Sequence, residues 1–193
     1  MSKTTNIMIV GVGGQGTLLA SKIMGDLYQR EGYDVKVSEV HGMSQRGGSV
    51  VTYVRFGEQV ASPIIDLGQA DIILSFEKLE ALRWLPYLKK DGIIITNTGE
   101  IAPMPVITGA AQYPEGIEAR ISASGARLVC VDAADIAKQA GIPRAVNVAL
   151  IGVFAKHSGI ALSQWETSLK NCVKAEFLAK NLAALRLGYQ SEN

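Results

Sequence analysis

The sequence predicts an α/β fold: a single doubly wound, Rossmann-like domain over residues 1–193, with a mostly parallel sheet and an antiparallel addition. Three observations predict it. Short apolar runs alternate with segments of helical spacing along most of the chain, which is the order of a doubly wound sheet. A glycine-rich turn at residues 11–16 directly follows the first run, and a second glycine-rich stretch at residues 41–48 directly follows the second. Because ligands meet an open parallel sheet at the carboxyl ends of its strands, both stretches are expected at one edge.

The expected strands are short runs of apolar and β-branched residues between turn residues. In chain order they cover residues 6–10, 34–40, 49–56, 71–76, 92–97 and 126–131. The run 49–56 follows the strand before it without a helix between them, so it is the expected antiparallel element. The turn at Gly57 and Glu58 favours a hairpin with the next short stretch. Residues 98–116 contain three glycines and three prolines and are expected to be mostly loop.

The expected helices have apolar residues that recur every three or four positions. They cover residues 15–30, 77–85, 133–140, 141–157 and 163–187. Pro86 stops the second helix. The fourth is apolar around its whole circumference, which predicts a buried helix in which Gly152 permits close packing. The last carries two apolar stripes on nearly opposite faces, so it either breaks near Lys174 or serves as a docking element for another chain.

The composition is that of an ordinary globular protein, with 48% hydrophobic and 19% charged residues. Nineteen basic and 18 acidic residues leave a formal net charge of +1, which argues against nucleic acid or an anionic membrane as partner. No signal peptide is expected, and no run approaches the ~20 apolar residues of a membrane span, so we expect a cytoplasmic protein. Cys130 and Cys172 are expected core residues, too few for an iron–sulfur cluster, which normally takes about four thiolates.

The glycine-rich turn matches the pattern G-x-G-x-x-G between a strand and a helix, with glycines at positions 11, 13 and 16. Such glycines let the backbone turn tightly, and the N–H groups at the helix start favour a phosphate or a carboxylate. Glu39 ends the second strand where an NAD-binding fingerprint places the acid that holds the ribose. Tight packing of strand on helix is an equally good explanation of these glycines.

The second glycine-rich stretch contains Arg46, whose planar charged group suits a carboxylate or a phosphate. An unperturbed imidazole, the side chain of His41, changes charge near neutral pH, and the glycines expose backbone donors. The alternative is a structural loop whose arginine pairs with a neighbouring acid or subunit. None of the candidate residues at this edge is assigned as a catalyst or a metal ligand. They are Gly11, Gly13, Gly14, Gln15, Gly16, His41, Ser44, Gln45, Arg46, Gly47, Gly48, Asn97 and Asn147.

Four stretches of the chain are similar to one known family: residues 11–16, residues 41–50 with the order His-Gly-Met-Ser-Gln-Arg-Gly-Gly-Ser-Val, residues 80–88 and residues 143–147. They resemble the gamma-type domain of 2-oxoacid:ferredoxin oxidoreductases, most closely the beta subunit of the indolepyruvate enzymes. The likeness extends over most of the chain, and the stretch 41–50 is its most specific part.

The resemblance implies oxidative decarboxylation of an aryl 2-oxoacid to an acyl-CoA, with coenzyme A as co-substrate and ferredoxin as electron acceptor. It implies that thiamine diphosphate, magnesium and iron–sulfur clusters belong to a larger alpha subunit, and that this chain carries no cofactor and is inactive alone. A homodimer of the isolated chain is compatible with it. Lys90 precedes Asp91 and Gly92, so the Gly-Asp-Gly pattern that anchors thiamine diphosphate through a metal is not present there.

The sequence is also compatible with two other functions. A stand-alone NAD-dependent oxidoreductase is favoured by Glu39 and opposed by the missing substrate domain and the missing acid/base pair. A non-enzymatic assembly or regulatory module would use a nucleotide only structurally.

Overall fold

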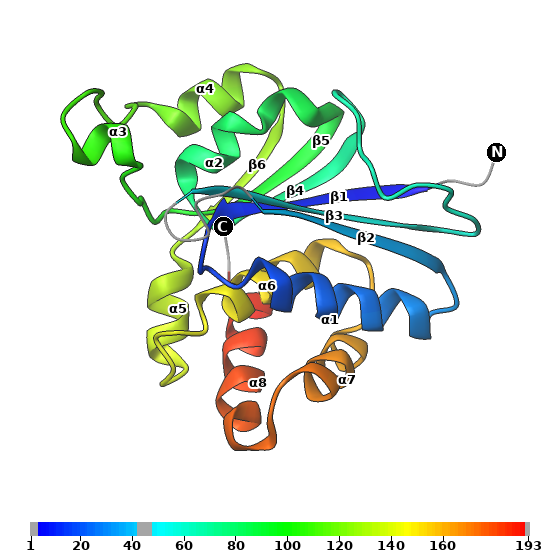
Figure 1. Cartoon of the computed structure of the whole chain (residues 1–193). Coiled ribbons are helices and arrows are strands. Elements are labelled where there is room, and N and C mark those ends of the chain that lie inside the picture. The colour runs from blue at the N-terminus through cyan, green and yellow to red at the C-terminus, as the bar shows by residue number, and fades with distance from the viewer. Residues whose placement is uncertain (1–3, 42–47, 192–193) are drawn as a thin grey trace.

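The computed structural model describes residues 4–41 and 48–191 (Figure 1). At its centre is one sheet with the strand order β2-β3-β1-β4-β5-β6. The strands are β1 (Thr5–Val12), β2 (Asp34–His41), β3 (Ser49–Gly57), β4 (Ala70–Ser75), β5 (Leu88–Asn97) and β6 (Arg127–Val131). β3 runs antiparallel to both of its neighbours, and the pairs β1–β4, β4–β5 and β5–β6 are parallel. The expected mostly parallel sheet with an antiparallel addition is confirmed.

The antiparallel strand pairs differently from the expected hairpin. β3 inserts between β1 and β2, with Val12 opposite Ser49 and His41 opposite Val50. The expectation that the stretch after Gly57 pairs back on β3 was wrong, because β1 and β2 occupy both edges of β3. Residues 58–69 are irregular and are held by side chains instead. Arg55, for example, donates to the carbonyl oxygen of Ser62 at 2.7 Å.

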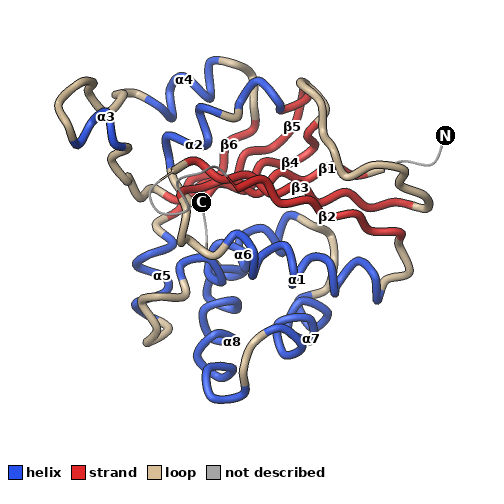
Figure 2. Tube along the Cα trace, viewed as in Figure 1, coloured by secondary structure: helices blue, strands red, loops and turns tan. Residues whose placement is uncertain are grey.

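Helices cover both faces of the sheet, as a doubly wound fold requires (Figure 2). One face carries α1 (Thr17–Arg30), α5 (Ala133–Gln139), α6 (Val146–His157), α7 (Leu162–Cys172) and α8 (Ala175–Gln190). The other carries α2 (Lys78–Arg83), a 3-10 turn (Leu85–Tyr87) and α4 (Ile117–Ala123), with the short α3 (Met104–Ile107) projecting beyond them. Alternate residues of β1 enter the two cores: Ile7 faces the first set of helices, and Met8 faces the second.

The buried helix α6 packs directly on α8, as its apolar circumference predicted. A Cβ atom at Gly152 would lie 2.1 Å from the carbonyl oxygen of Leu185, and one at Gly188 would lie 2.0 Å from that of Ala149. The two helix backbones therefore touch, and the expectation of close packing at Gly152 is confirmed. α6 begins at Val146, later than expected, because residues 141–145 form turns that start with the left-handed Gly141 (φ +72°).

Of the two possibilities left open for residues 163–187, the structure shows the break near Lys174: the chain divides into α7 and α8 at Val173 and Lys174, both of which are extended. The break turns both apolar stripes inward, since Trp165 of α7 and Leu185 of α8 are fully buried in the same core. Neither α3 nor α4 was expected. In the described ranges, no helix has both the length and the apolar character needed to cross a membrane.

Candidate functional site

The two glycine-rich stretches meet at the carboxyl edge of β1. The backbone N–H of Gly13 donates to the carbonyl oxygen of Gly48 at 2.9 Å, so the expectation of a shared edge is confirmed. His41 is the last residue of β2, and only its backbone position is described. The rest of the second stretch lies outside the described residues, including the candidates Ser44, Gln45, Arg46 and Gly47.

The side chain of Gln15 holds the glycine-rich turn in shape. Its Oε1 accepts a hydrogen bond from the N–H of Val12 at 2.7 Å, and its Nε2 donates to the carbonyl oxygen of Phe76, just past β4, at 2.9 Å. Gly11 is needed because a Cβ there would lie 2.8 Å from Gln15 Oε1. The sequence suggested Gln15 as a source of backbone donors, whereas its amide side chain bridges two strand ends.

The start of α1 is shaped by Gly14 and Gly16, which adopt left-handed conformations with φ of +98° and +86°. A Cβ at Gly16 would lie 2.3 Å from Nδ2 of Asn147, which donates to the carbonyl oxygen of Gly16 at 3.5 Å. No side chain in the described part of the chain caps the N-terminus of α1. Leu19 and Ala20 already donate to the carbonyl oxygen of Gly16, so the amides before them are the ones that favour an anion at the sheet edge.

Asn97 is a buried clamp between elements. Its Oδ1 accepts from the N–H of Ala133, the first residue of α5, at 3.1 Å, and its Nδ2 donates to the carbonyl oxygen of Phe76 at 3.4 Å. Gln15 and Asn97 therefore converge on the same carbonyl group, which follows β4 at the carboxyl edge. This places the ends of β1, β4 and β5 and the start of α5 around one point.

A cavity of about 250 Å³ opens at that point. It is lined by four of the candidates, Gly14, Gln15, Asn97 and Asn147, and also by Arg144 and Glu100. Sequence reasoning left Arg144 and Glu100 out of the candidate set. Arg144 could have been found from the sequence, because it lies in the stretch 143–147 that carries the family resemblance. Glu100 follows β5 in a stretch expected to be loop, and no sequence pattern pointed to it.

A second hollow, of about 640 Å³, continues from the first past Arg144 and Asn147 toward α8. Its wall is mostly apolar, with Leu19, Ile142, Pro143, Val173 and Phe177, and Lys180 adds a second cation. The two hollows form a groove that suits a molecule with an anionic group and an apolar part. The groove is equipped for binding, because its charged groups are cations and one exposed acid rather than a paired acid and base.

A buried carboxylate supports the wall of this groove. Glu77 is 1% exposed and caps α2 through the N–H of Glu80 at 2.9 Å. Its other oxygen accepts from the N–H of Ile101 at 3.1 Å and from the hydroxyl of Tyr113 at 2.6 Å. Burial, together with this carboxylate, raises the pKa of Tyr113 well above its ordinary value.

A second buried carboxylate lies close to the second glycine-rich stretch. Glu80 accepts hydrogen bonds from the hydroxyl of Ser49, the first residue of β3, and from the indole N–H of Trp84 at 3.2 Å. Arg83 pairs with it at 2.9 Å. Burial nevertheless raises the pKa of Glu80. This cluster fixes the point at which the chain re-enters the sheet after the stretch 42–47.

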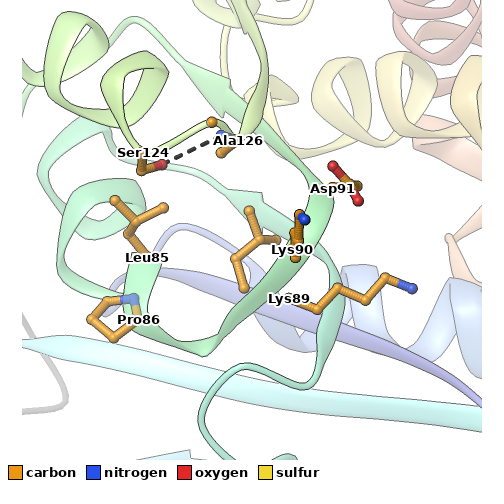
Figure 3. A pocket seen from close by; sticks show the side chains of 9 residues that line it. Leu85, Pro86, Lys89, Lys90, Asp91, Ser124 and Ala126 are labelled. Carbon is orange, nitrogen blue, oxygen red and sulfur yellow. Dashed lines mark hydrogen bonds between the residues drawn. The ribbon is translucent and has the colours of Figure 1, made fainter.

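The other end of the sheet carries a separate hollow of about 550 Å³ (Figure 3). It lies where β5 begins, beside Lys90 and Asp91, and against the turn at Ser124 and Ala126 that leads into β6. None of the candidate residues lines it. This hollow therefore lies at the end of the sheet opposite to the carboxyl edge, where the sequence predicted the site.

Glu39 does not occupy the place that an NAD fingerprint requires. In that pattern the acid ends the strand next to β1, whereas here β3 separates β1 from β2. The hydroxyl of Ser21 on α1 donates to Glu39 at 3.2 Å. This acid thus takes part in the packing of β2 on α1.

Fold and site together define a doubly wound α/β domain with a glycine-rich turn and a groove at the carboxyl edge of its sheet. The chain belongs to the pyruvate ferredoxin/flavodoxin oxidoreductase family, whose sequence profile matches residues 6–191. The indolepyruvate oxidoreductase subunit IorB of Thermococcus kodakarensis is 43% identical, over 98% of this chain and 96% of the relative. The corresponding subunit of Pyrococcus horikoshii is 41% identical over the same shares of the two chains.

Solved structures show the same fold. The gamma subunit of a keto/oxoacid ferredoxin oxidoreductase from Geobacter sulfurreducens matches with a TM-score of 0.72 at 20% identity, over 96% of each chain.

Proposed function

We propose that this chain is the cofactor-free subunit of an indolepyruvate (arylpyruvate):ferredoxin oxidoreductase. The whole enzyme oxidatively decarboxylates an aryl 2-oxoacid to an acyl-CoA and carbon dioxide, and transfers the electrons to ferredoxin. One observation carries the proposal: the 43% identity to an archaeal indolepyruvate oxidoreductase subunit spans nearly the full length of both chains. The proposed location is the cytoplasm.

The reaction's cofactors are assigned to the partner, a larger alpha subunit. Thiamine diphosphate supplies carbanion chemistry, and iron–sulfur clusters carry single electrons. The described residues of this chain do not fit the metal-bearing groups. Among residues 4–41 and 48–191, no group of three or more His, Cys, Asp or Glu side chains is placed to hold a metal. Burial raises the pKa of the Cys130 thiol to about 11, so this cysteine is protonated at neutral pH and is a poor metal ligand.

This chain contributes binding surface at the carboxyl edge of its sheet. The N–H groups at the start of α1 and the guanidinium of Arg144 favour an anionic group, and the apolar wall from Ile142 to Phe177 favours a hydrocarbon part. Coenzyme A, the 2-oxoacid and an acidic segment of the partner each offer such an anion. Arg46, which the sequence places at the same edge, is proposed to pair with an anion there as well.

The proposal is tested by reconstitution. The chain is produced alone and together with the cofactor-bearing subunit from the same source, and reduction of ferredoxin is followed with indolepyruvate and coenzyme A. We expect activity from the complex and none from either subunit alone. An isolated chain that oxidises an arylpyruvate, or a loaded complex that reduces ferredoxin with no 2-oxoacid, would contradict the proposal. Titration of the isolated chain with NADH tests the alternative, and micromolar binding would favour it.

A further inference from the structure

The loop between β5 and α4 leaves the body of the protein and returns to the same carboxylate. Ile101 at its start and Tyr113 at its end both donate to Oε1 of the buried Glu77, at 3.1 and 2.6 Å. Figure 1 shows α3, within this loop, projecting beyond α2 and α4. We call residues 101–114 the charge-free arm, because none of these 14 residues has a charged side chain.

The arm has a defined shape of its own. The N–H of Ala111 donates to the carbonyl oxygen of Pro105 at 3.0 Å, and the hydroxyl of Thr108 donates to that of Met104 at 3.1 Å. A surface loop with close ends and internal hydrogen bonds is an Ω-loop. Because the loop is already ordered, a partner that binds it avoids most of the entropy cost of fixing it.

The arm presents large apolar side chains to solvent. Met104 and Ile107 are 65% and 66% exposed and lie one turn apart on the same side of α3. At this chain's 19% charged residues, a 14-residue surface segment would contain about three charges, and surfaces that stay in water are normally rich in them. Depletion of charge together with exposed Met and aliphatic side chains is typical of the core of a protein interface.

The exposed apolar residues Ile64 and Leu67 provide the contrast. They are 49% and 64% exposed, but Asp66 lies between them and their segment also contains Glu58. Exposed apolar residues interrupted by charges are normal on a protein surface, whereas the arm is uncharged throughout.

We infer that the charge-free arm docks on the cofactor-bearing subunit of the complex, with Met104 and Ile107 in an apolar pocket of that partner. This inference depends on the proposed function. The position of the arm argues for this occupant, because Ile101, its first residue, lines the cavity beside the glycine-rich turn. The proposed binding of the partner at this cavity would bring it to the base of the arm, which makes the two contacts continuous.

The test replaces the two exposed side chains and compares the result with a matched control. The variant is Met104→Asp/Ile107→Asp, and the control is Ile64→Asp/Leu67→Asp, which places two carboxylates at exposed sites with the same spacing. Affinity for the cofactor-bearing subunit is measured by surface-immobilised binding of purified proteins. Because two central apolar contacts are lost, we expect the variant to bind ~100-fold more weakly or not at all and the control to bind within about threefold of wild type. Far-UV circular dichroism and thermal unfolding should be unchanged in both.

The outcomes separate this inference from the proposed function. If the wild-type complex is active and the arm variant binds as tightly as wild type, the inference is wrong and the proposed function stands. If the wild-type chain does not bind the larger subunit, both are wrong. If the variant abolishes only self-association of the isolated chain, the occupant is a second copy and the inference is overturned.

A measurement without substitutions guards against a variant that fails to fold. Hydrogen exchange of the wild-type chain is compared with and without the larger subunit. We expect the amides of the arm to be protected in the complex, and an arm that exchanges equally fast in both states contradicts the inference.

Discussion

Two surface segments border the candidate cavity, and they are built in opposite ways. The glycine-rich turn is held along its length by polar contacts within the chain, chiefly those of the Gln15 amide. The charge-free arm is tied to the body at its two ends by Glu77 and exposes Met104 and Ile107 between them. A turn that presents backbone donors suits a small anion, whereas an uncharged arm suits a protein surface. The comparison supports the proposal that one edge of the sheet serves both a ligand and a partner.

The largest loss of stability is expected from a substitution at the base of the arm, which should affect the arm and not the glycine-rich turn. Glu77→Ala removes the cap of α2 and leaves Tyr113 and Ile101 without their acceptor, so we expect a loss of about 3 kcal/mol in the free energy of unfolding. Hydrogen exchange should accelerate in the arm and stay unchanged in the glycine-rich turn. Equal acceleration in both would show that they are not independent. Glu100→Ala, which removes an exposed acid that pairs with Lys78, is the control and should change stability by less than about 0.5 kcal/mol.

The next effect concerns the backbone of the glycine-rich turn. Gly16→Ala should destabilise the chain by about 3 kcal/mol or slightly less, since it adds a Cβ at 2.3 Å from Asn147 to the strain of a positive φ. Gly14→Ala has the strain alone, with nothing within 4 Å of its Cβ, and should destabilise by about 1 kcal/mol. Urea denaturation measures both. If the free energy of unfolding falls equally in the two variants, the contact with Asn147 does not shape the turn.

A smaller effect is expected from the Gln15 side chain. Gln15→Ala leaves the N–H of Val12 and the carbonyl of Phe76 without these partners, which predicts a loss of about 1–2 kcal/mol. Gln139→Ala, which removes a single exposed contact with Asp135, should change stability by less than about 0.5 kcal/mol. Urea denaturation measures the free energy of unfolding of both variants. Equal losses would show that the Gln15 side chain does not hold the turn.

The smallest effect gives the arm a pH dependence. The raised pKa of Tyr113 means that the folded state favours the protonated phenol, so its stabilising contribution is complete below the ordinary pKa of 10 and is lost as the pH rises above it. Tyr113→Phe should therefore cost about 1 kcal/mol at pH 8, and the difference from wild type should shrink in more alkaline solution. Unfolding measured at several pH values checks this, and a constant difference would contradict the assigned hydrogen bond.

Much of the fold follows from local sequence, and what does not follow depends on distant contacts. Apolar runs predicted the strands of the parallel sheet. The apolar residues around the whole circumference of α6 predicted that this helix is buried. The partners of β3 were missed because an antiparallel strand can pair with the strand before or after it, and the local pattern is the same. The helix break at Val173 and Lys174 was left open because neither residue is a proline or a glycine.

The candidate site was predictable where a local pattern carries it. The spacing of the glycines predicted the turn. Asn97 was predicted at the site because it ends an expected strand. The bridge from Gln15 to Phe76 was not predictable, because it joins residues 61 positions apart. The charge-free arm was predicted only as loop, from its glycine and prolines, because the sequence does not show that Met104 and Ile107 are exposed.

The central claim is that this chain supplies binding surfaces to an enzyme whose cofactors lie in another subunit. Indolepyruvate-dependent reduction of ferredoxin, measured for each purified subunit and for their mixture in the presence of coenzyme A, tests it most directly. The account predicts turnover only in the mixture, with the Met104→Asp/Ile107→Asp chain failing to restore it. Turnover by this chain alone, or by the larger subunit at the full rate of the mixture, would contradict the claim.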